Sequence, residues 1–310
     1  MLDVPAVRST RLSSSSLGLI AILLTVLCWA VAANVAHDLF MAGINPLELA
    51  GTSAMIATLG FAILNSFWGG GQTRPMNLKQ FALGLVLVFL VGADYIAIQQ
   101  LPVAIAIVLL FTSPILVVLW TAFAARRIPS RFVLIALTLS ILGVVLVSKL
   151  LESNLAQVNW FGIGIGLTTA VFFAAYIILS EQMAGTGEPV GILLKTYAVA
   201  SLFWLAYQLT QGLPTALLTP EHFPKVLVVG IVGNLLPYLL FLWSIQRVHA
   251  ERAAIVATLE PFVAAILAWL WFGQTLTLLQ IAGGILIIVA VTAMQLKVPQ
   301  PSPYQHSEQR

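Results

Sequence analysis

The sequence has few charged residues for its length. Only 8% of its 310 residues are Asp, Glu, Lys or Arg, whereas a soluble domain carries about 25%. Hydrophobic residues make up 60% of the chain. This composition excludes an ordinary water-soluble enzyme or binding module and is typical of a polytopic membrane protein.

Cysteine, histidine and catalytic motifs are also scarce. The single cysteine, Cys28, excludes an internal disulfide. The histidines at positions 37, 222, 249 and 306 lack the spacing of metal ligands, so we expect no metal site and no cofactor. The motifs G-x-x-x-x-G-K-[ST], H-E-x-x-H and G-x-S-x-G are absent, which excludes a built-in ATPase motor and disfavours an enzyme.

Long apolar stretches occupy almost the whole chain instead. Each has about 20 residues, enough for a helix to cross the ~30 Å hydrocarbon core of a bilayer. The first is longer than the apolar core of a cleaved signal peptide, so we include it among the spans. The ten predicted spans cover residues 17–36, 46–67, 78–98, 102–125, 131–150, 159–180, 189–209, 225–246, 250–272 and 275–296.

The basic residues indicate how these spans are oriented. With the N-terminus inside, the inner segments hold Arg8, Arg11, Arg74, Lys79, Arg126, Arg127, Arg131, Arg247, Arg252, Lys297 and Arg310. Only Lys149 and Lys225 fall outside, and Lys195 lies within a span. The positive-inside rule therefore predicts that both termini are cytoplasmic. The basic residues form no stripe of the kind that binds nucleic acid.

The two halves of the chain resemble each other. A shift of 147 positions aligns Pro114 with Pro261, and a shift of 144 aligns Trp29 with Phe173. Five spans per half force the second half to enter the membrane in the opposite orientation. We therefore expect an all-α membrane protein of ten transmembrane helices in two inverted five-helix repeats. Its predicted parts are a cytoplasmic tail (1–16), a first repeat (17–150), a second repeat (151–296) and a second cytoplasmic tail (297–310).

Glu260 and Pro261 interrupt the ninth span near its middle. Glu260 lies about eleven residues into the span, or ~16 Å along a helix, close to the bilayer centre. A carboxylate at this depth should face the bundle interior or water, because lipid contact is costly. Pro261 donates no backbone hydrogen bond and frees a carbonyl near residue 257. The pair predicts a kinked polar spot that either contacts substrate or protons, or joins neighbouring helices by a hydrogen bond.

Other polar and aromatic residues of the spans are candidates for the same cavity. Asp94 lies near the outer end of the third span, where it either lines an outer vestibule or is a solvated helix-end residue. The aromatic candidates have a second interpretation as packing or as an interfacial belt. The predicted substrate-binding residues are Trp29, Asn34, Asp94, Tyr95, Tyr176, Asn234, Tyr238 and Glu260, and helix kinks are predicted at Pro114, Pro237 and Pro261.

Three segments carry a family resemblance. They are "LCWAVAANV" in the first span, "TSPILVVLW" in the fourth, and "TLEPFVAAILAWLWFGQTLTLLQIAGGILIIVAV" in the second half. Together they resemble the drug/metabolite transporter superfamily, specifically its EamA-type ten-helix members, over residues 17–296. The resemblance implies a transporter of small metabolites with a central cavity between the halves, opened alternately to either side. It also implies that export is common and that bacterial relatives carry amino acids.

From these observations we expect a secondary exporter of a small metabolite such as an amino acid, in a bacterial cytoplasmic membrane. Its partners would be the substrate, the lipid bilayer and protons, without nucleic acid, and a monomer fits the sequence. Glu260 would be the proton-linked or hydrogen-bonding residue, with Asp94 at the outer mouth. The alternatives are a multidrug exporter of amphipathic cations, a non-transporting polytopic membrane protein and a membrane enzyme.

Overall fold

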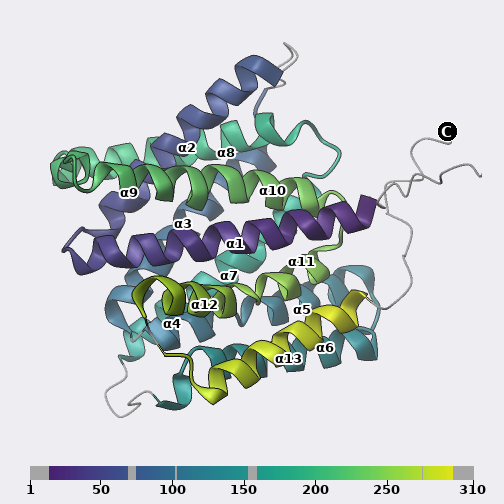
Figure 1. Cartoon of the computed structure of the whole chain (residues 1–310). Coiled ribbons are helices and arrows are strands. Elements are labelled where there is room, and N and C mark those ends of the chain that lie inside the picture. The colour runs from purple at the N-terminus through teal and green to yellow at the C-terminus, as the bar shows by residue number, and fades with distance from the viewer. Residues whose placement is uncertain (1–13, 69–74, 102, 153–158, 274, 296–310) are drawn as a thin grey trace, which may run out of the picture.

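The computed structural model describes residues 14–68, 75–101, 103–152, 159–273 and 275–295, and all regular structure in these ranges is helical (Figure 1). Eight segments there are long and apolar enough to cross a membrane, with mean hydropathies of 1.5 to 2.4. Two further apolar helices are shorter, α6 (Arg131–Val147) and α13 (Leu278–Gln295). The all-α membrane class predicted from the sequence is confirmed. The C-terminal tail 297–310 and residues 1–13 lie outside the described part of the chain.

Four of the five uninterrupted long helices begin at residues that favour a helix start. Pro46 and Pro189 occupy first helical turns, where no backbone N–H is needed. Asn77 and Gln80 form a capping box, with bonds of 2.8 Å and 3.1 Å between each side chain and the other residue's backbone N–H. The Asn159 side chain accepts a bond of 3.0 Å from the N–H of Phe161. The five helices are α1 (Ser14–Met41), α2 (Pro46–Trp68), α3 (Leu78–Gln100), α7 (Trp160–Gln182) and α8 (Pro189–Gln211).

Two of the predicted spans are each built from two shorter helices. The fourth consists of α4 (Val103–Leu110) and α5 (Ser113–Ala125), and the ninth of α11 (Ala250–Ala257) and α12 (Glu260–Phe272). Pro114 and Pro261 stand in the first turns of α5 and α12. At both breaks a tighter turn of the 3₁₀ type replaces the α-helical bond, as in the 3.2 Å bond from the Thr258 N–H to the Ile255 carbonyl.

The eighth predicted span contains an irregularity of another kind. It runs through α9 (Phe223–Val228), the π-helix η4 (Val229–Leu235) and α10 (Leu236–Ile245), with Pro237 in the first turn of α10. A π-helix inserts one extra residue into a turn and is often found at functional sites. Two short 3₁₀ turns, η1 (Leu150–Glu152) and η3 (Thr215–Leu218), complete the elements.

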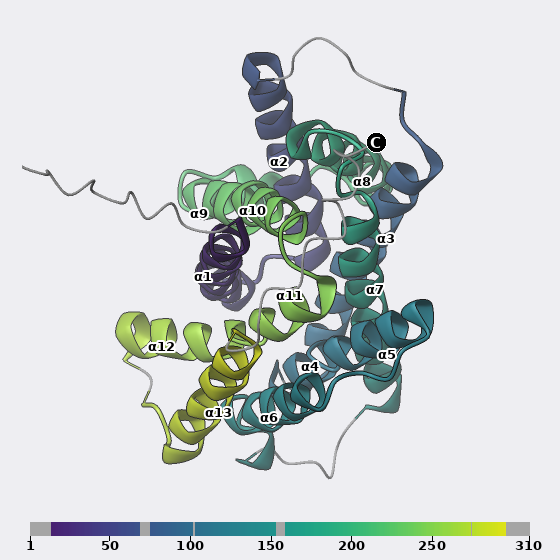
Figure 2. The same ribbon diagram turned by 90° about the vertical axis from the view of Figure 1, so that its right-hand side faces the viewer.

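Helix α1 lies between two groups of helices. In Figure 1 and in the perpendicular view of Figure 2, α1 lies between a group formed by α2, α8, α9 and α10 and a group formed by α11, α12 and α13. Helices α3 and α7 pack side by side, and α6 packs along α13. The largest fully buried side chains include Phe61, Tyr176, Tyr197 and Phe241, whereas many leucines and isoleucines are exposed on the outside, as expected of a surface that faces lipid.

Candidate functional site

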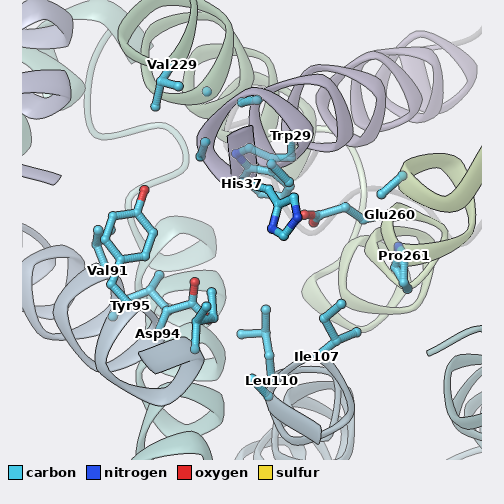
Figure 3. A pocket seen from close by; sticks show the side chains of 18 of the residues that line it. Trp29, His37, Val91, Asp94, Tyr95, Ile107, Leu110, Val229, Glu260 and Pro261 are labelled. Carbon is cyan, nitrogen blue, oxygen red and sulfur yellow. The ribbon is translucent and has the colours of Figure 1, made fainter. Parts of the chain in front are cut away.

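A cavity of about 270 Å³ lies inside the bundle, between helices that are far apart in the sequence. Its walls come from α1, α3, α4, α7, η4, α10 and α12, and Figure 3 shows side chains that project into it. Most of the lining is apolar with a few polar groups, which is the usual composition of a small-molecule site. The lining residues are Trp29, Ala32, Ala33, Ala36, His37, Phe40, Leu90, Val91, Asp94, Tyr95, Ile98, Ala106, Ile107, Leu110, Phe111, Phe173, Val229, Gly233, Asn234, Tyr238, Glu260, Pro261 and Ala264.

Glu260 is the first residue of α12, and its carboxylate extends into the cavity (Figure 3). Helix α11 ends at Ala257 because Pro261 has no N–H with which to continue the hydrogen-bonding pattern. The break places the carboxylate at the N-terminus of α12, where free N–H groups and the helix dipole favour negative charge. The Glu-Pro pair therefore creates a helix end within a membrane span and places an acid there.

Asp94 and Tyr95 reach the cavity from α3, on the side opposite Glu260 (Figure 3). Asp94 lies six residues before the end of α3, ~9 Å at 1.5 Å per residue, and Glu260 lies twelve before the end of α12, ~18 Å. Both helix ends are on the side predicted to be outside. The Tyr95 ring packs edge-on against Phe40, with 5.6 Å between ring centroids. The two carboxylates thus share one cavity at different depths.

His37 also lines the cavity, although we did not predict it from the sequence. It lies on the face of α1 that carries Trp29, Ala33 and Phe40, which are spaced three or four residues apart. Its side chain is exposed and projects into the cavity (Figure 3). His37 could have been predicted from its position two helical turns after Trp29. The spacing between the histidines gives no such indication.

The three ionisable side chains, Asp94, Glu260 and His37, have no hydrogen-bonding or ion-pair partner in the described part of the chain. The neighbouring Asp38, by contrast, is paired with Lys225. An ionisable group within a membrane span is costly unless it is paired or solvated. The space that all three side chains share is the cavity. The alternative in which Glu260 joins two helices has no corresponding bond in the described part of the chain.

Aromatic rings form the wall of the cavity toward the side predicted to be cytoplasmic. The Trp29 ring packs against Phe173, Tyr238 and Phe241 with centroid distances of 6.1, 5.6 and 5.5 Å. Tyr176 lies behind them, fully buried, with its ring 5.3 Å from that of Tyr238. This layer is rigid and apolar, and it offers ring faces to a bound molecule.

Some predicted site residues have structural contacts of their own. Asn234 lines the cavity, but its amide donates to the Val229 carbonyl at 3.2 Å and accepts from the Tyr197 hydroxyl at 3.2 Å, which holds the π-helix. Asn34 and Tyr176 are outside the cavity lining. Asn34 is directed at α12, where its Nδ2 donates to the Ala264 carbonyl at 3.3 Å. Substrate contact by these two residues stays a prediction.

A recess at the end of α1 and α3 neighbours the cavity. Phe40 and Ile98 line both the cavity and this recess, whose other walls include Asn45, Pro46 and Gln99. At the opposite end the bundle is held together by contacts between α7 and the start of α11. The Glu181 carboxylate accepts from the Ala250 N–H at 3.1 Å and lies 3.5 Å from Nδ1 of His249. The recess therefore adjoins the cavity at the side predicted to be outside.

In the described part of the chain, membrane-spanning helices surround a cavity lined by unpaired ionisable side chains, which is typical of a membrane transporter of small molecules. The chain belongs to the EamA-like transporter family, whose profile matches it twice, over residues 16–149 and 160–295. It is therefore a multi-pass integral membrane protein and not an enzyme, as the sequence predicts. The family resemblance of the three sequence segments is confirmed.

Similar proteins agree with this assignment. An uncharacterized transporter of Archaeoglobus fulgidus is 30% identical over 76% of this chain and 85% of its own length. The threonine/homoserine exporter RhtA of Escherichia coli K12 is 28% identical over 81% of this chain and 83% of its own. RhtA of Salmonella typhimurium LT2 is 27% identical over 94% of this chain and 95% of its own length. A solved crystal structure with 13% identity superposes with a TM-score of 0.78 over 90% of this chain and 96% of its own, which shows a shared fold.

Proposed function

We propose that this chain is a secondary exporter of small amino-acid-like metabolites. The observation that carries the proposal is the cavity, in which the unpaired carboxylates of Asp94 and Glu260 face the same space as the Trp29 ring. An ammonium group is attracted both to carboxylates and to the face of an indole ring. Relatives that align over most of this chain are named threonine/homoserine exporters, which are proteins for substrates of this kind.

The size of the cavity favours a small metabolite over a multidrug substrate. Its volume of about 270 Å³ is below the ~300–1,000 Å³ of typical sites for drug-sized ligands. An amphipathic cation remains the second candidate, because two carboxylates beside aromatic rings would also attract it. A non-transporting role has no support, since the interior is neither sealed nor fully paired in the described part of the chain.

The topology we propose consists of ten spans in two inverted repeats, 17–150 and 151–296, with both termini cytoplasmic. Its support is the recurrence of helix boundaries. Helices α4 and α5 begin at 103 and 113, and α11 and α12 begin 147 positions later, at 250 and 260. Packing recurs too, because α1 lies against the broken ninth span and α7 against the broken fourth. Inverted repeats of this kind place the substrate site at their interface.

Alternating access would follow from the two ends of the cavity. The end near Phe40 and Ile98 adjoins the recess, whereas the aromatic layer and the contact of Glu181 with His249 lie at the other end. Export requires the second end to open while the first closes. The broken helices α4–α5 and α11–α12 supply places where half-spans could tilt, because no continuous hydrogen-bonding pattern crosses them.

Glu260 is the residue we propose to couple export to protons. It lies deeper than Asp94 and at a helix break, so its protonation would be sensitive to which end of the cavity is open. In a proton antiporter the substrate accumulates in the acidic compartment, because protons leave that compartment as substrate enters. Glu260→Gln keeps the size of the side chain, resembles the protonated acid in having both a donor and an acceptor, and cannot titrate.

The test is transport by the purified full-length protein in liposomes. We expect saturable flux of labelled L-threonine or L-homoserine, with accumulation in the acidic compartment under a pH gradient. Glu260→Gln should lower gradient-driven accumulation about tenfold while exchange without a gradient persists. Glu188→Gln is the matched control, because Glu188 is exposed at the start of α8 and does not line the cavity.

Two results would contradict parts of this proposal separately. Flux of amphipathic cations without amino-acid flux would replace the substrate class and leave the transport mechanism in place. Unchanged flux and unchanged pH dependence in both Glu260→Gln and Glu260→Ala would remove Glu260 from the mechanism while leaving the transported substrate established.

A further inference from the structure

Acidic side chains outnumber basic side chains in the lining of the cavity. Two of the lining side chains are acids, Asp94 and Glu260, and none of the lining residues is a lysine or an arginine. An amino acid carries an ammonium group and a carboxylate on the same small molecule. The two acids account for the ammonium group, but they would repel the carboxylate unless a compensating group is nearby. His37 is the lining residue that can carry a positive charge.

His37 is positioned for such a role by the shape of α1. Its neighbours on the cavity face of α1 are Ala32, Ala33 and Ala36, which are small and leave the imidazole accessible. Figure 3 shows the ring projecting toward the middle of the cavity, with Asp94 entering from α3 and Glu260 from α12. A small zwitterion in this space would have donors and acceptors on different helices, which also orients it.

The surroundings of His37 leave its ring available to a ligand. It forms no hydrogen bond or ion pair with any described residue, so neither nitrogen is engaged by the protein. Asp38, the nearest acid along the chain, is paired with Lys225 of α9 and does not line the cavity. A histidine that served only for packing would be buried or hydrogen-bonded, whereas His37 is exposed.

We propose that His37 binds the carboxylate of the transported amino acid, while Asp94 and Glu260 attract its ammonium group. The proposal rests on the function proposed above and deepens it. It makes the protein selective for substrates that carry both charges, because a substrate without a carboxylate leaves His37 unused. A hydrogen bond to a charged group contributes about 1.5–3 kcal/mol, so its loss should be visible as a change of tenfold or more.

The experiment compares two ligands in three proteins. Transport of labelled L-threonine is measured in liposomes with wild-type protein, His37→Ala and His37→Gln, and L-threonine amide, which lacks the carboxylate, is added as a competitor. We expect His37→Ala to raise the KM for threonine about tenfold and to leave the inhibition constant of the amide unchanged. His37→Gln keeps one hydrogen-bond donor and should have an intermediate KM.

His222→Gln is the matched control, because His222 lies before α9 and lines neither the cavity nor the recess. Each variant is first checked for a monodisperse peak in detergent. If His37→Ala weakens the binding of threonine and of its amide equally, or weakens neither, the proposed role of His37 is wrong. Threonine flux by the wild-type protein would still support the proposed function. Wild-type protein that carries no amino acid would contradict the proposed function itself.

Discussion

Asn34 connects the two helices that carry His37 and Glu260. Its Nδ2 donates within α1 to the Ala30 carbonyl at 2.9 Å and across to the Ala264 carbonyl of α12 at 3.3 Å. Ala264 lies one turn after Glu260, and Asn34 lies one turn before His37. This hydrogen bond therefore fixes the separation of two side chains that face the same cavity.

Replacing Asn34 with leucine should weaken the α1–α12 contact without removing a direct ligand contact. Hydrogen bonds between membrane helices contribute about 0.6 kcal/mol on average, and the largest about 1.7. We expect Asn34→Leu to lower the melting temperature in detergent by a small amount and to leave the KM for threonine within about twofold. A large rise in KM with an unchanged melting temperature would instead support the substrate contact predicted from the sequence.

The positions of Asn34 and His37 show how far the site could be predicted from single residues. The unusual chemistry of Asp94, Asn234 and Glu260 within apolar spans was sufficient to select residues that meet in one cavity. In α1, the direction of a side chain around the helix decides whether it reaches the cavity. Asn34 lies five residues after Trp29, about 140° around the helix, whereas His37 lies eight residues after it, about 80°.

At the scale of the elements, close packing of α6 on α13 depends on two glycines. A Cβ at Gly143 would lie 2.5 Å from Cγ1 of Ile287 and 2.7 Å from the Gly283 carbonyl oxygen. The contact with backbone means that a rotamer change could not relieve the clash. These two helices are shorter than the eight segments that are long enough to cross a membrane, so their association has less length over which to compensate.

Gly143→Ala should therefore separate α6 from α13 and destabilise the protein by about 1–3 kcal/mol. Gly164→Ala is the matched control, because a Cβ at Gly164 of α7 would meet no atom within 4 Å and alanine favours a helix more than glycine. Melting temperatures of the two variants in the same detergent test this difference. Equal melting temperatures would show that α6 and α13 can move apart without loss of stability.

The interrupted helices were predictable only in part. Pro114, Pro237 and Pro261 indicate where α-helical hydrogen bonding must stop, because proline lacks an N–H and excludes the preceding turn. The π-helix before Pro237 has no such local signal. It depends on Asn234 bonding back to Val229 and on Gly230 and Gly233 lying against neighbouring helices, and such contacts exist only in the folded bundle.

At the scale of the whole molecule, hydropathy was enough to predict an all-α membrane protein, since lipid permits few other structures. The cavity could not be predicted in the same way. Its walls come from seven elements distributed from α1 to α12, and which of their faces meet depends on the packing of the complete bundle. The positive-inside rule predicts which side of that bundle faces the cytoplasm.

The recess shared by Phe40 and Ile98 predicts that the cavity is reached from outside the cell in this conformation. In a protein whose only cysteine has been removed by Cys28→Ala, a new cysteine at Ala33 would face the cavity. We expect a membrane-impermeant thiol reagent to label it from the outer side of oriented vesicles. A cysteine at the buried Ala174, on α7, is the control and should stay unlabelled from that side. Threonine should slow labelling at position 33 by occupying the cavity. Labelling that is equal from both sides and unaffected by threonine would contradict a cavity that is closed on its cytoplasmic side.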